Sequence, residues 1–168
     1  SGGLAVVAAG KRLLLVDLAN PAAPVVRSTT TVSGWAAAVA LLGGLVYVAD
    51  LEDGLFIYDV SHPTAPILRG AFYTPDAIGV SVANSWAVVS NHARGITLFD
   101  VSNPAAPQSL AAAATAGLAR RTRLAGDLLV AADDQGGVVT LRLRDGPPPT
   151  VTPTPTLTPT WTATATAT

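Results

Sequence analysis

Apolar runs of five or six residues alternate with short polar turns along most of the chain, a spacing typical of β-strands rather than helices. In the middle of the chain, Leu45 to Ala49 and Leu55 to Val60 flank a polar turn that ends at Gly54. Comparable pairs follow twice, namely Trp86 to Ser90 with Ile96 to Val101, and Leu128 to Ala132 with Val138 to Leu143. Each pair predicts an antiparallel hairpin.

One more strand is predicted before each hairpin, and another after the polar corner that ends a unit. The preceding strands are Ala36 to Leu41, Ile78 to Val82 and Ala119 to Leu124, and the strands after a corner are Val25 to Thr31, Ile67 to Tyr73 and Gln108 to Ala114. Four antiparallel strands in about 42 residues make one blade of a β-propeller. The sequence therefore predicts an all-β, propeller-type repeat array.

Counted from Leu4, the predicted strands number three, four, four and three, or about 3.5 blades. The repeat units are 4–31, 36–73, 77–114 and 119–143. Propellers close into rings of about four to eight blades. We therefore expect this chain to be part of a larger propeller.

An eight-residue segment recurs as DLANPAAP, DVSHPTAP and DVSNPAAP, at intervals of 42 and 41 residues. We expect the leading aspartate to accept backbone N–H bonds in the turn that follows, while proline fixes φ where no ladder donor is needed. The predicted structural corners are Asp17, Pro21, Asp59, Pro63, Asp100 and Pro104. Because these residues recur in successive units, they are expected to serve the fold and not a reaction.

The hairpin from Val46 to Asp50 and from Gly54 to Ser61, with the sequence VYVAD and GLFIYDVS, resembles the LVIVD repeat of bacterial propeller proteins. The resemblance covers residues 4 to about 143. It departs from the pattern in the last copy, where Arg142 to Arg144 replaces the Asp-Val-Ser sequence. It implies a propeller fold and a location on the bacterial surface or outside the cell, but no reaction.

In an up-and-down blade, the loop between the second and third strands emerges on the same side as the connection to the next blade. Most charged turn residues fall on that side, and binding residues concentrate on loops held by a rigid scaffold. The candidates on this charged loop face are Asp50, Glu52, Asp53, Asp76, His92, Arg94, Asp133 and Asp134. A protein or glycan partner is expected there, although solvated turns without a ligand have the same composition.

Arg121 and Arg123 are a second candidate site, because their strand is expected to line the central channel. Strand alternation sends both to one side and Arg120 to the other, so the pair could hold an anion or meet channel acids. The acidic turns offer oxygen ligands for Ca²⁺ but lack the spacing of calcium loops. His62 and His92 fall on opposite sides of the array. No metal site, cofactor or catalytic residue is therefore predicted.

The composition restricts the partners further. With ten basic and eleven acidic residues, the net charge of −1 creates no field that would attract nucleic acid or an anionic membrane. The chain lacks Cys, which excludes disulfides and thiolate ligands. The charge-free run 28–49 is interrupted by Gly43-Gly44 and is interpreted as strands, not a membrane span, and no signal peptide is visible. Aromatic residues, including Trp35 and Tyr73, are expected to pack between blades.

From Thr150 to Thr168 every second residue is Thr, and three of the residues between are Pro. Proline cannot donate to a ladder, and the segment is uncharged. This composition predicts a disordered Thr/Pro-rich linker or stalk over 147–168, after a propeller domain over 1–146.

The sequence thus predicts a non-enzymatic binding or scaffold module of a bacterial surface protein, located outside the cytoplasm. Its expected partners include the remaining blades of the same polypeptide. The alternative is a propeller hydrolase or lyase that uses channel-facing acids, with or without Ca²⁺. Such an enzyme would carry His and acidic residues on its innermost strands, whereas Ala36 to Leu41 and Ile78 to Val82 are small and apolar. This difference favours binding.

Overall fold

Twelve strands and one turn of 3₁₀-helix form residues 3–143, which are the residues that this computed structural model describes. The first sheet contains β1 (Leu4–Asp17), β2 (Val25–Leu42), β3 (Leu45–Asp50), β4 (Gly54–Asp59) and β5 (Ile67–Phe72); the second contains β6 (Gly79–Ala83), β7 (Trp86–Ser90), β8 (Ile96–Asp100) and β9 (Gln108–Ala113); the third contains β10 (Arg121–Ala125), β11 (Leu128–Ala132) and β12 (Val138–Arg142). The 3₁₀ turn, Asp134–Gly136, lies between β11 and β12. All strand pairs are antiparallel and join neighbours along the chain.

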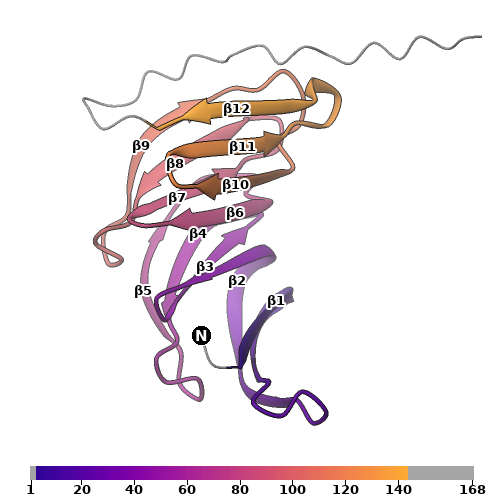
Figure 1. The fold of residues 1–168 in the computed structure, drawn as a ribbon. Helices are drawn as coiled ribbons and strands as arrows, with labels where there is room; N and C mark the ends of the chain where they lie inside the picture. Colours follow the sequence, from indigo (N-terminus) through magenta and orange to yellow (C-terminus); the bar gives the residue numbers. More distant parts are fainter. Residues whose placement is uncertain (1–2, 144–168) are drawn as a thin grey trace, which may run out of the picture.

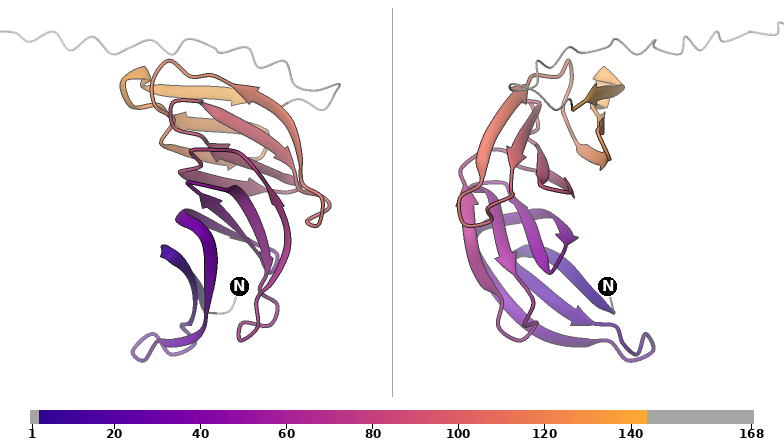
Figure 2. Two further views of the ribbon diagram at one scale, coloured as in Figure 1. Left: turned by 180° about the vertical axis from the view of Figure 1, so that it is seen from behind. Right: turned by 60° about the vertical axis from the view of Figure 1, so that its left-hand side comes forward.

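The three sheets stack along an arc, with β1 at one end and β12 at the other (Figures 1 and 2). The innermost strands β2, β6 and β10 lie next to one another. In residues 3–143 the only helical segment is the 3₁₀ turn. The predicted all-β, propeller-type fold is therefore confirmed.

The elements β1 and β2 each combine two predicted strands, so that fourteen predicted strands appear as twelve elements. A straight strand of 14 residues would hold the ends of β1 about 45 Å apart. Instead Leu18 N donates a hydrogen bond to Gly3 O, so β1 folds back on itself, and Gly10 has a positive φ of 64°. The first half of β2 pairs with β1 and its second half pairs with β3.

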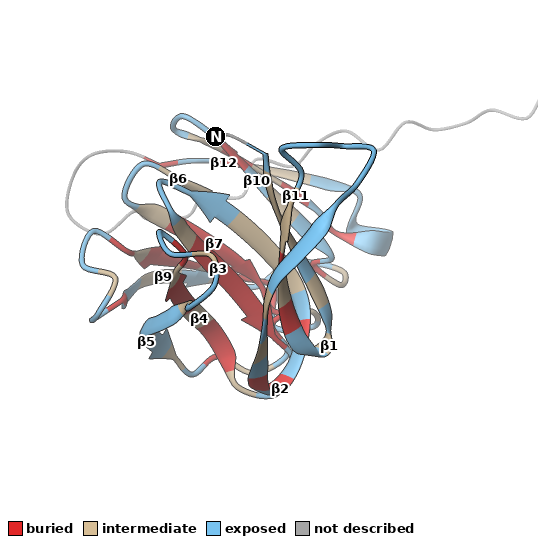
Figure 3. Cartoon of the chain, turned by 90° about the horizontal axis from the view of Figure 1, so that it is seen from below, coloured by how far each residue is buried: buried red, intermediate tan, exposed pale blue. Residues whose placement is uncertain are grey.

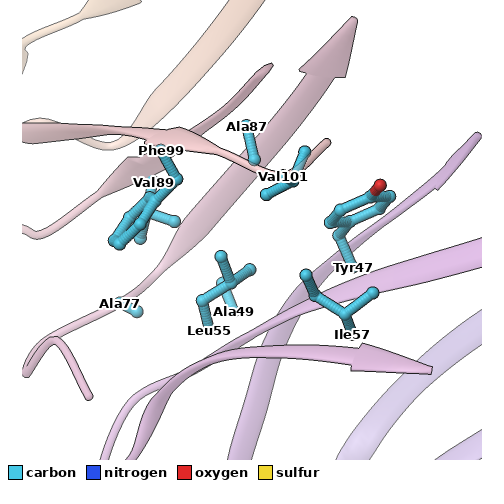
Figure 4. Close-up of a cluster of buried hydrophobic side chains, with 9 residues drawn as sticks. All are labelled: Tyr47, Ala49, Leu55, Ile57, Ala77, Ala87, Val89, Phe99 and Val101. Atoms are coloured by element: carbon cyan, nitrogen blue, oxygen red, sulfur yellow. The ribbon is translucent and has the colours of Figure 1, made fainter. Parts of the chain in front are cut away.

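Apolar side chains alternate along each strand and fill the spaces between successive sheets. On β3, Tyr47 and Ala49 face the second sheet, while Val46 and Val48 pack against β1. Figure 4 shows the cluster between the first and second sheets, in which Phe99 is fully buried. Figure 3 shows that burial is concentrated on the middle strands of the sheets. The first and second sheets are thus covered by apolar side chains on both faces, whereas the third sheet contributes to one cluster alone.

Two aromatic residues correct the expectation that all aromatics pack between blades. Trp35 is 52% exposed and Tyr73 is 70% exposed. Trp35 lies where the pairing of β2 passes from β1 to β3, and Tyr73 follows the end of β5. Both residues are therefore at the rim of the array, where no neighbouring sheet covers them.

The boundary near 146 and the predicted linker 147–168 lie outside the described residues, as does Arg144. Within 3–143 there is no helix of the length and apolarity that a membrane crossing requires.

Candidate functional site

The corner aspartates Asp17, Asp59 and Asp100 each end a strand and bond to the turn that follows. Their Oδ1 atoms accept hydrogen bonds from the backbone N–H two residues later, at 2.8, 2.9 and 2.8 Å. The prolines Pro21, Pro63 and Pro104 lie in these turns. Each turn is also closed by a backbone bond, for example from Ala65 N to His62 O at 2.9 Å. These contacts are local to one blade.

Two of the three corners carry a second, ionic contact. Arg27 donates to Asp17 Oδ2 at 2.6 Å, and Arg69 donates to Asp59 Oδ2 at 2.7 Å. The pKa values of Asp17, Asp59 and Asp100 are all lowered, chiefly by the backbone N–H two residues later. In Asp59 the hydrogen bond from Arg69 is the next cause.

Asp50, a candidate for the charged loop face, is fully buried at the end of β3. Its Oδ1 accepts hydrogen bonds from the backbone N–H groups of Trp35 at 3.1 Å, Glu52 at 3.0 Å and Asp53 at 3.2 Å. Two of these donors belong to the turn after β3, and the third, Trp35, lies inside β2 where its pairing passes from β1 to β3. One carboxylate therefore fixes the hairpin turn to the connection from the preceding unit.

The second and third sheets have a buried polar residue at the same position. Asn91 Nδ2 donates to Thr74 Oγ1 at 2.7 Å and to Pro75 O at 3.1 Å. Asp133 Oδ2 accepts from Gly117 N at 2.7 Å. In both cases the partner lies in the connection between two sheets. We call Asp50, Asn91 and Asp133 the clasp residues, because each holds a hairpin turn against an interblade connection.

Because the side chains of Asp50 and Asp133 are buried, a partner bound to the loop face could not reach them. Sequence reasoning did not single out Asn91 as a site residue. The signal was present, because the alignment of Ala49-Asp50 with Ser90-Asn91 puts a polar residue at the end of the same strand in both units. Recurrence at one strand position indicates a structural role.

Three of the remaining loop-face candidates, namely Asp76, Arg94 and Asp134, form ion pairs. Arg94 Nε lies 3.2 Å from Asp76 Oδ2, and Arg120 lies 3.2 Å from Asp134 Oδ2. Each pair links a hairpin turn to an interblade connection, and all four side chains remain largely exposed.

The other loop-face candidates are Glu52, Asp53 and His92. Glu52 is exposed, while Asp53 and His92 are half-buried. The carbonyl of His92 accepts a bond from Ala119 N at 3.0 Å, which ties its turn to the next sheet. In residues 3–143, no three His, Asp or Glu side chains come together as a metal-binding group.

Arg121 and Arg123 are exposed on β10 and lie opposite Ala132 and Val130 of β11. An open groove of about 560 Å³ lies beside them and continues along β2 and β6. The matching positions on β6 are Gly79 and Ser81, so the two arginines break the repeat. Neither forms an ion pair with another described residue.

Comparison with known proteins gives a family and a fold. The family described as LVIVD repeat matches residues 1–31, 33–74 and 76–113. No curated protein matches the chain. Two solved structures of computationally designed proteins are similar: Ika4, with a TM-score of 0.69 and 9% identity over 86% of this chain and 88% of that chain, and Ika8, with a TM-score of 0.68 and 10% identity over 85% of this chain and 44% of that chain. At such low identity the likeness concerns the fold alone.

Proposed function

Because the chain belongs to the LVIVD repeat family, we propose that it is a non-enzymatic binding or scaffold module of a bacterial surface protein, located outside the cytoplasm. A protein or glycan partner binds to the charged loop face. The observation that carries this proposal is the way the loops are held. Buried clasp residues fix their backbones, while charged and aromatic side chains at the same loops stay exposed.

Rigid loops with exposed side chains favour binding, because little conformational entropy is lost when a partner docks. The innermost strands support the same conclusion over the hydrolase alternative. In the parts of these strands that pair with β3, β7 and β11, the exposed charged side chains are those of Arg121 and Arg123, whose guanidinium groups donate hydrogen bonds to an anion but supply no carboxylate or imidazole for acid–base catalysis.

The test is a pair of matched variants on opposite rims, screened on arrays of defined glycans and peptides. The loop-face variant is Glu52→Ala with Arg94→Ala, and the control is His62→Ala at a corner. We expect the loop-face variant to lose binding and the control to keep it. Equal binding by both would refute the loop-face assignment, and a recovered ligand with altered mass would refute a non-enzymatic role.

Location is tested separately. Protease added to intact bacteria that produce the full-length protein should degrade this module. Protection until the cells are lysed would place the module in the cytoplasm and contradict the proposal.

The remaining blades of the same polypeptide are the partners that we propose for the two ends of the array. Val138 on β12 is 49% exposed, although Leu55 at the matching position of β4 is fully buried. At the other end Val7 is 42% exposed. Apolar blade faces of this kind pair with whatever neighbour is present.

We therefore expect residues 1–146 alone to self-associate. Addition of the flanking blades should give a monomer. Light scattering checks this expectation, and a monodisperse monomer of residues 1–146 would show that the end faces need no neighbour.

A further inference from the structure

The most unusual exposed side chain of the described residues is Trp35, at the junction between the first unit and the first full blade. Its indole is 52% exposed, although its backbone is held at both polar groups. Trp35 N donates to Asp50 Oδ1 at 3.1 Å, and Trp35 O accepts from Leu51 N at 3.0 Å. The side chain is thus presented from a fixed backbone position at the loop face.

One side of the indole lies against the turn of β1. A Cβ atom at Gly10 would be 3.4 Å from Cζ2 and Cη2 of Trp35, which is ordinary contact distance. Gly10 has a φ of 64° and carries no side chain, so the ring lies over bare backbone. The six-membered ring of the indole is therefore held against backbone, while about half of the side chain remains exposed to solvent.

Trp35 is also an exception to the repeat. Three matching alanines are buried: Ala36 inside β2, where its pairing passes to β3, and Ala77 and Ala119 just before β6 and β10. The residues just before the second and third of these alanines are Asp76 and Leu118. Features that support every blade recur in every blade, so a tryptophan at one junction alone is not required by the fold.

The surroundings of the indole are polar. Glu52 belongs to the same loop, because its backbone N–H and that of Trp35 donate to the same Asp50 Oδ1 atom. Lys11 and Arg12 follow Gly10 and are exposed. None of these three charged side chains forms an ion pair within residues 3–143. Hydrogen-bond donors and acceptors therefore flank the open ring.

We propose that Trp35 is the stacking platform of a carbohydrate site, and this inference rests on the loop-face binding proposed above. The apolar C–H face of a pyranose packs on an indole, while its equatorial hydroxyls point outward to charged side chains. Glu52 accepts from hydroxyl groups, and Lys11 and Arg12 donate to them.

The same surroundings argue against a protein as the occupant. A tryptophan that anchors a protein interface usually lies in the centre of an apolar patch that excludes water. The indole of Trp35 contacts Gly10, and the exposed residues Lys11 and Arg12 follow that glycine in the chain, while Leu51, whose N–H bonds to Trp35 O, is 36% exposed. A sugar ring needs one aromatic face and several polar groups, and this surface supplies both.

The experiment uses intrinsic fluorescence. The chain has three tryptophans, so Trp86→Phe with Trp161→Phe leaves Trp35 as the single emitter. The probes are hexamers of β-1,4-linked glucose, of β-1,4-linked N-acetylglucosamine and of galacturonate. We expect at least one to shift the emission to the blue and to protect the indole from iodide quenching.

Two single variants test whether the hexamer binds at Trp35. In the wild-type background, Trp35→Ala should weaken binding of that hexamer by at least about tenfold. Tyr73→Ala removes the other highly exposed aromatic of this face and should bind as wild type does. Because both side chains are exposed, both variants should melt at the wild-type temperature, which excludes unfolding as the cause.

No response to any of the three hexamers, or equal affinity in Trp35→Ala and Tyr73→Ala, would overturn the inference. The peptide array separates this failure from a failure of the proposed function. A peptide that binds wild type and Trp35→Ala equally, but not the Glu52 and Arg94 variant, would replace the glycan with a protein partner and leave loop-face binding intact.

Discussion

Aspartate has two different roles on opposite rims of the same blade. At the corner, Asp59 lies near the surface and bonds to the turn that begins two residues later. At the clasp, Asp50 is fully buried and bonds across 15 residues to the connection from the preceding unit. The corner therefore shapes one blade, whereas the clasp holds two successive units together.

The comparison of corner and clasp shows when an acidic residue that recurs in a repeat can be considered a candidate for ligand binding. Both kinds recur with the blade, and both stabilise backbone N–H groups that would otherwise lack partners. They differ in burial and in the sequence separation of their hydrogen bonds. The clasp also lies on the rim where a ligand is expected, so an acid of that rim is a binding candidate only if it is not used to hold the loop.

The largest expected effect comes from breaking the clasp. Asp50→Ala leaves the N–H groups of Trp35, Glu52 and Asp53 without their acceptor, which should cost about 2–4 kcal/mol of unfolding free energy. Asp50→Asn is the matched control, because it keeps the acceptor and because the next blade has Asn91 at this position. Urea unfolding measures both.

Asp50→Asn should be close to wild type or slightly more stable. The Oδ2 atom of Asp50 is buried and has no hydrogen-bond partner among the described residues, so removing its charge relieves a desolvation cost, while the amide N–H groups that replace this oxygen gain no acceptor and offset part of that relief. If the alanine and asparagine variants were equally destabilised, the negative charge and not the hydrogen bonds would be the important property of the clasp.

The partners of the corner aspartate were predicted from the sequence and those of the clasp were not, for a physical reason. The bond from Ser61 N to Asp59 spans two residues, so any chain with this local sequence can form it. The bond from Trp35 N to Asp50 depends on which connection packs against which turn. The segment DLEDG at 50–54 has the composition of a solvated turn. Its first residue, Asp50, is buried only because a neighbouring unit covers it.

Similar limits apply to the rest of the molecule. Hydrophobic alternation and the repeat interval were sufficient to predict the strands of the second and third sheets, because both signals are local. The exposure of Trp35 depends on the turn of β1, where Gly10 leaves the backbone bare. No local pattern around residue 35 contains that information.

An intermediate effect is expected from acid. The corner aspartates have lowered pKa values in the folded protein, so each favours folding at pH values above the unfolded value near 3.8. That contribution is lost as the pH falls through the folded pKa. Between pH 5 and about pH 3 the melting temperature of the wild type should therefore fall more steeply than that of a variant with Asp17, Asp59 and Asp100 all replaced by Asn.

The asparagine side chains still accept the turn N–H bonds but do not titrate, so the comparison isolates the charge. Calorimetry from pH 3 to pH 7 checks it. Parallel curves for the two proteins would mean that the corners do not contribute to the pH dependence.

The smallest effect should come from the ion pair at the second corner. Leu110 occupies, after Asp100, the position that Arg69 occupies after Asp59, so Arg69→Leu converts the second corner into the third. The Arg69 side chain is 49% exposed, and such ion pairs contribute little, so the melting temperature should fall by less than about 3 °C. Asp59→Ala removes both the ion pair and the bond from Ser61 N, and should therefore lower the melting temperature further. Calorimetry of the two variants separates the contacts. An Arg69→Leu variant as unstable as Asp59→Ala would show that the arginine, and not the turn bond, holds the corner.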